Sequence, residues 1–373
     1  MDNTEFKKKN YKIIVAAGGT GGHLFPAIAV IQQLDKMTDF LLDAHFIGCA
    51  DKIEARVVPQ FGYEFSKINI TGFTGILTIN TLLLPVKIFR SILKCKKIIK
   101  QFKPDAAICT GAYISYPLGV AAHQESIPLF LMESNVIPGK TIKMLAPKAE
   151  MIITSYTETL KYFHPEVKPK VKCLGNPIRE NLIDLPPREE SLRKFGLSES
   201  KKTVLVFGGS LGARSINEAT KESIKSLPVD KIQFIWQTGK NFKIEDELPD
   251  NVKVIEFIDD MASAYSAADL IISRSGATSC SEICSVGKPS ILVPYPNAAN
   301  NEQELNALVL ADNDAAIVVY DNEIGVRMTN LINLFLNKPN QFLSMGLRAK
   351  TFSNNKAALM IAQNILEKTN YYK

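Results

Sequence analysis

The sequence of 373 residues contains no run of about 18 apolar residues, the length that a membrane-spanning helix requires. Its six cysteines form no CxxC pair, and those at 280 and 284 lack partner ligands at zinc spacing. Scattered cysteines in a long chain indicate reduced thiols in a cytoplasmic protein. The apolar run at residues 13–17 is too short for the core of a signal peptide. We therefore expect a protein that is soluble or bound to a membrane surface.

The chain also lacks a strong overall charge, with 44 basic residues against 38 acidic ones and a formal net charge of +6. Hydrophobic residues make up 46% of the sequence and charged residues 22%, which is ordinary for a folded protein and excludes intrinsic disorder. At roughly 100–200 residues per domain, the length favours two domains. The charge is placed unevenly, because residues 65–104 contain eight basic residues and no Asp or Glu.

Two segments share one design, a short apolar run followed by a glycine-rich turn and a helical pattern. In the first, IIVAA leads into GGTGG within residues 12–22, and a helical pattern follows at 24–34. In the second, TVLVF leads into GGSLG within residues 202–212, before a helical pattern at 213–227. Such a segment begins a nucleotide-binding βα unit, so two copies predict two Rossmann-like α/β domains.

Mostly apolar strands alternate with helical patterns over the rest of the chain, which predicts parallel sheets covered on both faces. We expect a polar linker at residues 176–200 and a final helix at 355–367. Further strands are expected at residues 45–47, 106–110, 129–133, 151–154, 171–174, 233–237, 252–257, 270–273 and 290–293.

The first glycine-rich turn, residues 18–23, is neither the G-x-G-x-x-G of dinucleotide-binding proteins nor a P-loop with its lysine, which weakens the NAD and ATP interpretations. Its glycines permit a ligand to approach closely, and the N-terminus of the following helix favours negative charge. His23, one of only four histidines, lies where the turn meets the helix and can act as a general base. A plain tight turn with a capping or packing histidine is the alternative.

Two segments of the second domain present polar groups suited to a nucleotide. Ser210, in the turn at residues 208–214, can donate to a phosphate, as can the amides around it. Residues 274–282 pass from the end of a strand to the start of a helix, where Glu282 suits the hydroxyls of a ribose. The alternative is that Glu282 only caps the helix.

Loops that follow parallel strands line the ligand crevice of such folds. In the first domain these loops include residues 111–117 and 133–139, and Arg179 near the domain junction can meet a diphosphate. The helix start at residues 294–307 offers Asn301, Gln303 and Asn306 to sugar hydroxyls, or is simply polar. The acceptor-site candidates in the two loops of the first domain are Tyr113, Ser115, Glu133 and Asn135.

The acid-free segment at residues 65–104 is the strongest anomaly in the composition. Ile88, Ile92, Cys95, Ile99 and Phe102 have helical spacing and should face the core. Basic residues beside exposed apolar ones suit an anionic membrane surface, although an ordinary solvated basic helix is the alternative. Nucleic acid fits less well, because the apolar residues are aliphatic and offer no stacking aromatics. We call the following residues the basic apolar patch: Leu82, Val86, Lys87, Phe89, Arg90 and Lys94.

Taken in order, these motifs resemble those of the MurG-type UDP-N-acetylglucosamine:lipid I N-acetylglucosaminyltransferases of bacterial cell-wall synthesis. The resemblance implies the GT-B glycosyltransferase fold, in which two Rossmann-like domains have parallel sheets facing across a cleft. Residues 1–178 would bind the acceptor and the membrane, residues 179–354 would bind UDP-N-acetylglucosamine (UDP-GlcNAc), and a helix at 355–373 would pack back on the first domain. The matching segments are GGTGGHLFPAIAV, TGAYISYP, ESNVIPGKTIKMLA, GNPIRE, VFGGSLGARSIN, FIDDMASAYSAADLIISRSGATSCSEICSVGKPSILVPYP and NEQELNA.

The resemblance also implies a reaction. N-acetylglucosamine passes from UDP-GlcNAc to the 4-hydroxyl of the N-acetylmuramic acid of lipid I, with inversion and without a metal or other cofactor, and forms lipid II. The implied partners are UDP-GlcNAc, lipid I, the anionic inner leaflet and other cell-wall synthesis proteins, with no nucleic acid. The implied location is peripheral, on the cytoplasmic face of the bacterial cell membrane.

By the same resemblance, His23 is the base, Ile258 contacts the uracil through its backbone, and Glu282 contacts the ribose. Gln303 matches a contact to the donor sugar. The sequence departs from the usual family residues at Ala112, Tyr116, Met132, Ser134, Leu211 and Glu302. The positions that match the donor site are Thr20, Gly21, Gly22, Asn135, Arg179, Ser210, Ile258, Ala277, Thr278, Ser279, Cys280, Ser281, Glu282 and Gln303.

Two other hypotheses stay open on the residues alone. The first is another GT-B enzyme, either a diacylglycerol glycosyltransferase or a UDP-sugar 2-epimerase. An epimerase needs no lipid acceptor, so the basic apolar patch argues against it. The second is a non-catalytic membrane adaptor that binds a UDP-sugar, and against it stand His23 and the two complete glycine-rich turns.

Overall fold

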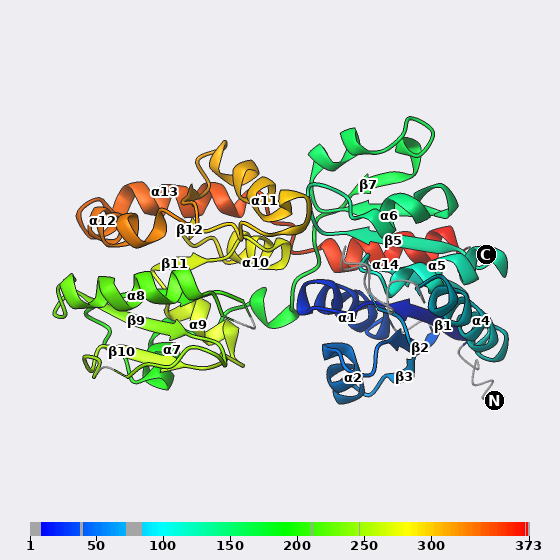
Figure 1. Ribbon diagram of the computed structural model, residues 1–373, viewed down its shortest axis with the longest axis horizontal. Helices are drawn as coiled ribbons and strands as arrows, with labels where there is room; N and C mark the ends of the chain where they lie inside the picture. The colour runs from blue at the N-terminus through cyan, green and yellow to red at the C-terminus, as the bar shows by residue number, and fades with distance from the viewer. Residues whose placement is uncertain are drawn as a thin grey trace, which may run out of the picture. The chain divides into compact units, whose positions relative to one another are not determined.

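The computed structural model of the chain describes residues 9–37, 40–71, 84–209, 212–245, 247–369 and 371. The chain divides into two units (Figure 1). Unit 1 comprises Met1–Pro177 and Lys356–Lys373, and unit 2 comprises Ile178–Asn355. Each unit is built on one parallel sheet with helices packed on it, as apolar strands alternating with helices predict. The predicted fold class of two parallel-sheet α/β domains is therefore confirmed, and a cleft between them stays a prediction.

The sheet of unit 1 has seven parallel strands in the order β3-β2-β1-β4-β5-β6-β7. These strands are β1 (Lys9–Ala16), β2 (Phe40–Gly48), β3 (Glu64–Lys67), β4 (Ala106–Cys109), β5 (Leu129–Glu133), β6 (Met151–Thr154) and β7 (Val171–Cys173). The helices are α1 (Gly21–Asp35), α2 (Ile53–Val57), α4 (Leu84–Phe102), α5 (Ser115–Gln124), α6 (Lys140–Leu145) and α14 (Ala357–Lys368). Short 3₁₀ turns are η1 (Val58–Phe61), η2 (Ala146–Lys148), η3 (Thr157–Tyr162) and η4 (Lys168–Lys170).

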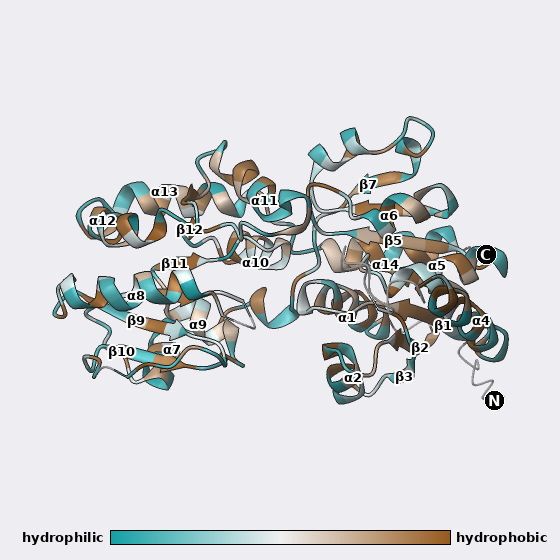
Figure 2. Cartoon of the chain, in the orientation of Figure 1, coloured by the Kyte–Doolittle hydropathy of each residue, from teal (hydrophilic) through white to brown (hydrophobic). Residues whose placement is uncertain are grey.

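Strand β1 lies at the centre of unit 1 and is apolar on both faces. Ile13 and Val15 belong to the core on one face, and Ile14 and Ala16 belong to the core on the other. Because successive side chains of a strand point to opposite faces, a strand covered by helices on both sides reads as a continuous apolar run. Figure 2 shows this as brown strands within the helical layers.

The last helix, α14, returns to unit 1 and packs on α1. Its Ile361, Ile365 and Leu366 are buried, and the Tyr11 hydroxyl lies 2.8 Å from the Thr369 hydroxyl. The final part of the sequence thus completes the core around the first strand and the first helix.

The sheet of unit 2 has six parallel strands in the order β10-β9-β8-β11-β12-β13. These strands are β8 (Lys202–Phe207), β9 (Ile232–Gln237), β10 (Val252–Ile255), β11 (Leu270–Ser273), β12 (Ser290–Leu292) and β13 (Ile317–Val318). The helices are α7 (Arg188–Phe195), α8 (Arg214–Ser226), α9 (Met261–Ala267), α10 (Ala277–Val286), α11 (Glu302–Ala311), α12 (Ile324–Asn337) and α13 (Pro339–Lys350), with 3₁₀ turns η5 (Glu180–Leu182) and η6 (Ala299–Asn301).

The prediction of a polar linker at residues 176–200 is wrong for most of that range. Helix α7 forms inside it, and Leu192 and Phe195 are buried in the core of unit 2. The helix is charged on its outer face, so its composition resembled a linker although its apolar residues face the core. Strands β3 and β13 were not predicted either, because each is short and only partly buried.

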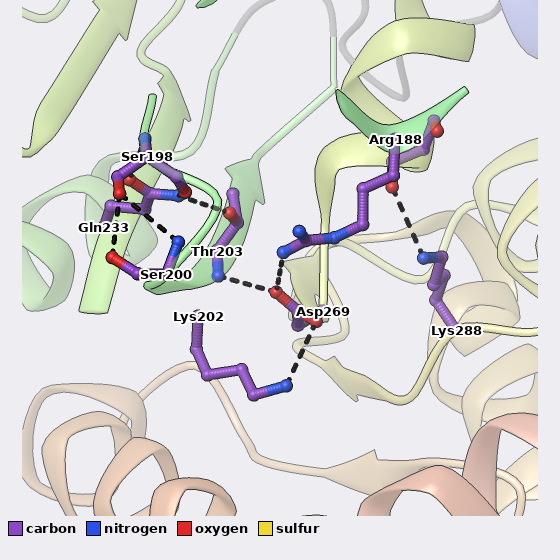
Figure 3. Close-up of polar contacts among 9 residues, drawn as sticks. Arg188, Ser198, Ser200, Lys202, Thr203, Gln233, Asp269 and Lys288 are labelled. Carbon is purple, nitrogen blue, oxygen red and sulfur yellow. Dashed lines mark hydrogen bonds and ion pairs between the residues drawn. The ribbon is translucent and has the colours of Figure 1, made fainter. Parts of the chain in front are cut away.

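A polar cluster joins α7 to the sheet of unit 2 (Figure 3). The Asp269 carboxylate, just before β11, accepts hydrogen bonds from Arg188 Nη2 at 2.8 Å and from the Thr203 backbone N–H at 2.9 Å. Lys202 Nζ lies 3.5 Å from the same carboxylate. Asp269 therefore links a helix to two neighbouring strands.

Candidate active site

The candidate base of unit 1 lies where the order of the strands reverses. Strand β1 pairs with β2 on one side and β4 on the other, and the loops after β1 and β4 meet at the carboxyl edge of the sheet. His23 Nδ1 lies 2.7 Å from the backbone oxygen of Thr110, which directly follows β4. A carbonyl oxygen only accepts, so Nδ1 carries the proton and Nε2 is left as the proton acceptor. Burial lowers the pKa of His23, and the bond to Thr110 opposes that shift.

The first glycine-rich turn is held from behind by a carboxylate that the sequence did not predict as functional. Glu54, on α2, is 0% exposed and accepts the backbone N–H groups of Gly19 and Cys49, each at 2.9 Å. A Cβ added at Gly18 or Gly48 would lie 2.3 Å or 2.4 Å from this side chain. Glycine is needed at both positions, in the turn at residue 18 and at the end of β2 at residue 48, because a buried glutamate occupies the space that a side chain would fill.

The turn passes into α1 without a side-chain cap. The Thr20 backbone oxygen accepts from the backbone N–H groups of His23 and Leu24, each at 3.2 Å, which places the imidazole in the first turn of the helix. Gly21 and Gly22 are the first two residues of this helix. Of the site residues predicted at positions 20–23, Thr20 and His23 line a cavity within unit 1.

This cavity has a volume of 890 Å³, enough for a sugar with further groups attached. Tyr113 lies on its wall beside Cys49, and burial raises the pKa of the Tyr113 hydroxyl. The cavity is lined by Gly18, Gly19, Thr20, His23, Cys49, Ala50, Asp51, Lys52, Lys67, Ile68, Asn69, Ile70, Thr71, Lys94, Ala112 and Tyr113.

Two of the side chains predicted to contact the acceptor form hydrogen bonds within unit 1. Ser115 is 0% exposed, and its hydroxyl donates to the Ala16 backbone oxygen at 3.0 Å. Glu133 is also buried, and its carboxylate accepts from the N–H groups of Asn135 at 2.9 Å and Gly139 at 2.8 Å. Both residues thus shape loops in the structure, and the acceptor contacts predicted for them stay predictions.

Asn135 belongs to the same loop as Glu133. Its side-chain Nδ2 donates to Glu133 Oε1 at 3.3 Å, and its backbone oxygen accepts from the Thr159 hydroxyl at 3.4 Å. The donor contact predicted for Asn135 stays a prediction.

The basic apolar patch lies on α4, with Leu82 outside the described residues. Val86 is 47% exposed and Phe89 is 62% exposed, while Arg90 and Lys94 are exposed beside them. A second cavity, of 240 Å³, is lined by Asn69, Val86, Lys87, Arg90, Ser91 and Lys94.

The opposite face of α4 packs inward as predicted. Cys95 and Ile99 are buried, and Ile88, Ile92 and Phe102 pack against the same core. The remaining surface of the helix carries exposed apolar and basic side chains together.

The corresponding reversal of strand order in unit 2 lies between β8 and β11. The turn after β8 is tight, because a Cβ at Gly208 would lie 2.3 Å from the backbone nitrogen of Ala213. Gln237, at the end of β9, donates from Nε2 to the Gly209 backbone oxygen and accepts the Ile258 N–H at Oε1, each at 2.9 Å. Gln237 was not predicted; it fixes the Ile258 backbone against the turn. Ser210 lies outside the described residues.

Arg179 and Glu282, both predicted from the sequence, contact each other. Arg179 donates from Nε and Nη2 to the two carboxylate oxygens at 2.9 Å and 3.0 Å, and Tyr265 donates its hydroxyl to Oε2 at 3.0 Å. Burial raises the pKa of the Glu282 carboxyl, and the Arg179 guanidinium opposes that shift. The alternative that Glu282 caps α10 is wrong, because Gly276 is the N-cap residue.

The predicted donor positions Ala277, Thr278, Ser279, Cys280 and Ser281 form the first turns of α10. The Ala277 and Cys280 side chains are buried, and burial raises the pKa of the Cys280 thiol. Ser281 donates its hydroxyl to the Ala277 backbone oxygen at 2.8 Å. Thr278 and Ser279 are partly exposed at the start of the helix.

Gln303 lies in the first turn of α11 and fastens neighbouring loops. Its Oε1 accepts the Tyr295 N–H at 3.1 Å, and its backbone oxygen accepts from the Ser275 hydroxyl at 2.8 Å. Burial raises the pKa of the neighbouring Glu302 carboxyl. The side chain predicted to contact the donor sugar is thus held in place by the Pro-rich loop.

Two classes of feature are absent from the part of the chain that the structure describes. No three His, Cys, Asp or Glu residues there are grouped in a way that could hold a metal ion. No helix there combines the length and the apolar character needed to cross a membrane.

Residues 13–154 match the glycosyltransferase family 28 N-terminal domain, and residues 203–365 match the glycosyltransferase family 28 C-terminal domain. The chain is 40% identical over 323 residues to the UDP-N-acetylglucosamine--N-acetylmuramyl-(pentapeptide) pyrophosphoryl-undecaprenol N-acetylglucosamine transferase of Christiangramia forsetii, covering 86% of this chain and 87% of that protein. It is 37% identical to the protein of the same name from Phocaeicola vulgatus, over 98% of both. The chain belongs to this transferase family.

The solved structures agree with the family. The crystal structure of Acinetobacter baumannii MurG matches at a TM-score of 0.75 and 26% identity, covering 96% of this chain and 99% of that one. A UDP-GlcNAc 2-epimerase from Neisseria meningitidis matches at a TM-score of 0.67 with 14% identity, which shows a shared fold alone. The predicted family, the GT-B fold class and the assignment as a glycosyltransferase are therefore confirmed.

Proposed function

We propose that this chain transfers N-acetylglucosamine from UDP-GlcNAc to the 4-hydroxyl of N-acetylmuramyl-(pentapeptide) pyrophosphoryl-undecaprenol, lipid I, and so forms lipid II. One observation carries the proposal. The proton on His23 Nδ1 is fixed by the Thr110 carbonyl at 2.7 Å, at the strand-order reversal of unit 1 and on the wall of an 890 Å³ cavity. A neutral imidazole whose Nδ1 proton is fixed can accept the proton of a hydroxyl group at Nε2 as a general base.

The reaction would proceed by inversion. His23 Nε2 takes the proton of the acceptor hydroxyl as its oxygen attacks C1 of the donor sugar. The bond from C1 to the β-phosphate oxygen breaks, and UDP leaves with the electron pair. The negative charge on UDP is stabilised by backbone amides, by the N-terminus of α10 and by cationic side chains, so no metal ion is required.

The donor is proposed to bind unit 2. The Ile258 backbone, held by Gln237, would meet the uracil, and Glu282, oriented by Arg179 and Tyr265, would meet the ribose. Gln303 would contact the sugar. Of the other donor positions, Ser210 follows β8 in the sequence and residues 277–281 belong to the start of α10, while Thr20, Gly21, Gly22 and Asn135 would contribute from unit 1.

The acceptor is proposed to bind unit 1, in the cavity beside His23. Tyr113 is the acceptor-site candidate that lines this cavity. The basic apolar patch would hold the enzyme on the anionic inner leaflet, as a peripheral protein on the cytoplasmic face of the membrane, because its exposed Val86 and Phe89 adjoin cations.

The test of the reaction uses radiolabelled UDP-GlcNAc with three acceptors in separate reactions: lipid I, diacylglycerol and none. We expect label to enter a lipid only with lipid I. Labelled glycolipid from diacylglycerol would instead identify the alternative transferase. Conversion of the nucleotide sugar to its 2-epimer without an acceptor would identify an epimerase.

The membrane proposal has its own variant. Phe89→Asp places a charge at the more exposed of the two described apolar residues of the patch, and we expect at least tenfold weaker sedimentation with vesicles of anionic phospholipid, since an apolar contact is lost and a repulsion is added. Val326→Asp, at a residue of α12 that is 78% exposed, is the matched control. Equal binding by the two variants would contradict the proposal.

A further inference from the structure

The cavity beside His23 contains cations that the proposed transfer step does not use. Lys67 ends β3 and Lys94 lies on α4, and both line the 890 Å³ cavity. Neither lysine forms an ion pair with a described residue, whereas Lys52 on the same wall lies 3.3 Å from Asp51. Two lysines from different elements thus line one cavity, and neither ammonium group is paired with a described carboxylate.

The segments of the chain that carry these two lysines are joined by a hydrogen bond. Asn69, two residues after β3, accepts a hydrogen bond at its backbone oxygen from the Ser91 hydroxyl of α4, at 3.2 Å. This bond fastens the segment that carries Lys67 to the helix that carries Lys94. The backbone at the end of β3 is therefore held beside α4, and the two exposed lysines reach the same cavity from these two elements.

The glycine-rich turn beside them is poorly suited to hold an anion. Its Gly19 N–H points inward to the Glu54 carboxylate at 2.9 Å, so this donor is already used. Glu54 is 0% exposed, and a buried carboxylate behind the turn repels a second anion in front of it. Although a glycine-rich turn before a helix usually suggests a phosphate site, in this cavity the side chains of Lys67 and Lys94 also supply positive charge.

The order of groups along the cavities matches the order of groups in the acceptor. The acceptor named for the relatives is a muramyl sugar joined through a pyrophosphoryl group to undecaprenol. Lys94 lines both the cavity that contains His23 and the 240 Å³ cavity that contains Val86 and Arg90 of the basic apolar patch. The sugar would therefore lie beside His23, the diphosphate beside the two lysines, and the lipid chain beside the apolar residues of the patch.

We propose that Lys67 and Lys94 form the binding site for the diphosphate of the acceptor, and that the first glycine-rich turn does not. This inference rests on the proposed function and specifies part of its acceptor site. The two ammonium groups balance the two negative charges of a diphosphate diester, and each donates to phosphate oxygens. Because Lys94 lines both cavities and also belongs to the basic apolar patch, the diphosphate would bind where the two cavities meet.

The test uses two soluble acceptors, without vesicles, so that membrane binding does not contribute. One is N-acetylmuramyl-pentapeptide diphosphate with a short isoprenyl chain, and the other is its monophosphate counterpart. The variants are Lys67→Gln, Lys94→Gln and the double variant. Lys97→Gln is the control, because Lys97 is an exposed lysine of α4 that lines neither cavity and its replacement removes the same charge.

We expect each single variant to raise the KM for the diphosphate acceptor roughly tenfold or more, the effect of losing a hydrogen bond to a charged group. The kcat and the KM for UDP-GlcNAc should change less than twofold, as should every constant of Lys97→Gln. The KM for the monophosphate acceptor should rise less than the KM for the diphosphate acceptor. The two KM values should therefore be similar in the double variant.

Two results would overturn the inference: KM values equal to those of Lys97→Gln, or equal losses with both acceptors. Calorimetric titration with the diphosphate acceptor alone measures binding without turnover, and undiminished affinity in the double variant would also overturn it. A wild-type protein that binds this acceptor through the two lysines but forms no product would contradict the proposed function and leave the diphosphate site supported.

Discussion

Three side chains of the candidate site are each held by backbone groups from another part of the chain. His23 is fixed by the Thr110 carbonyl, Glu54 by the Gly19 and Cys49 N–H groups, and Gln237 by the backbone of Gly209 and Ile258. Residue type and position relative to a glycine-rich turn were enough to predict His23. Residue type and position did not indicate Glu54 or Gln237. The hydrogen-bond partners of these two side chains lie 5 to 35 residues away in the sequence, and they come into contact only in the folded chain.

Removing the imidazole tests the proposed base. We expect His23→Ala to retain UDP-GlcNAc binding and to lose about 10²–10⁴-fold in kcat, the usual contribution of general base catalysis. Steady-state kinetics and calorimetric titration with UDP-GlcNAc measure the two effects separately. Near-normal turnover would remove His23 from the mechanism.

The wild-type pH profile gives an independent measurement of the same residue. Burial lowers the pKa of His23, so the imidazole is neutral and competent at pH 7. Activity should be lost only as the pH falls through a value below the ordinary imidazole pKa of about 6.5. An acidic limb of kcat/KM above that value would assign the titration to another group.

Glu54 should matter for stability as well as for the shape of the turn. In Glu54→Gln the amide keeps one oxygen, so one of the two buried N–H groups meets a donor instead of an acceptor. An unsatisfied buried donor costs about 1–3 kcal/mol, and urea unfolding should show a loss of that size. Glu166→Gln, at an exposed residue of unit 1, is the control and should change stability by less than about 0.5 kcal/mol. Equal midpoints would show that the turn does not depend on the carboxylate.

At the scale of elements, the sequence was most informative where apolar runs are long. Residues 13–17 and 204–207 are apolar without interruption, and both segments were predicted as strands of parallel sheets. Helix α7 was missed because its burial depends on a few side chains in a charged segment. Strands β3 and β13 were missed because pairing with a neighbour, not their own composition, makes them strands.

The Asp269 cluster in Figure 3 is a link between such elements, and its loss should affect only unit 2. Asp269→Asn weakens the contacts with Arg188 and Lys202 while keeping the size of the side chain. We expect a loss of about 2 kcal/mol, since hydrogen bonds between charged groups contribute about 1.5–3 kcal/mol. Unfolding followed through Trp236, the only tryptophan and a buried residue of β9, measures it. Asp230→Asn, at an exposed residue of unit 2, is the control, and equal midpoints for the two would contradict the link.

For the whole molecule, two strand–turn–helix motifs predicted two α/β domains, and the candidate residues gather at the carboxyl edge of each sheet. Composition alone indicated that one segment of the first domain is basic. The structure adds that Lys96 and Lys100 face Glu125 at 3.4 Å and 3.8 Å, so part of that charge is paired within unit 1. Lys67 and Lys94 have no such partner among the described residues, and their convergence on one cavity could not be predicted from their positions in the sequence.

The discontinuous composition of unit 1 leads to a prediction about how the chain unfolds. Helix α14 contributes Ile365 to the core that contains β1 and α1, although about 180 residues of unit 2 come between them in the chain. Ile365→Ala should cost unit 1 about 2–5 kcal/mol, the usual effect of removing a buried Ile side chain. Gln363→Ala, on the exposed side of the same helix, should cost less than about 0.5 kcal/mol.

The fluorescence of Trp236 monitors unit 2 alone, whereas far-UV circular dichroism monitors both units. Ile365→Ala should therefore lower the circular dichroism midpoint while the Trp236 transition keeps its position. If both transitions shift together, the two units unfold as one cooperative body and the division does not describe stability.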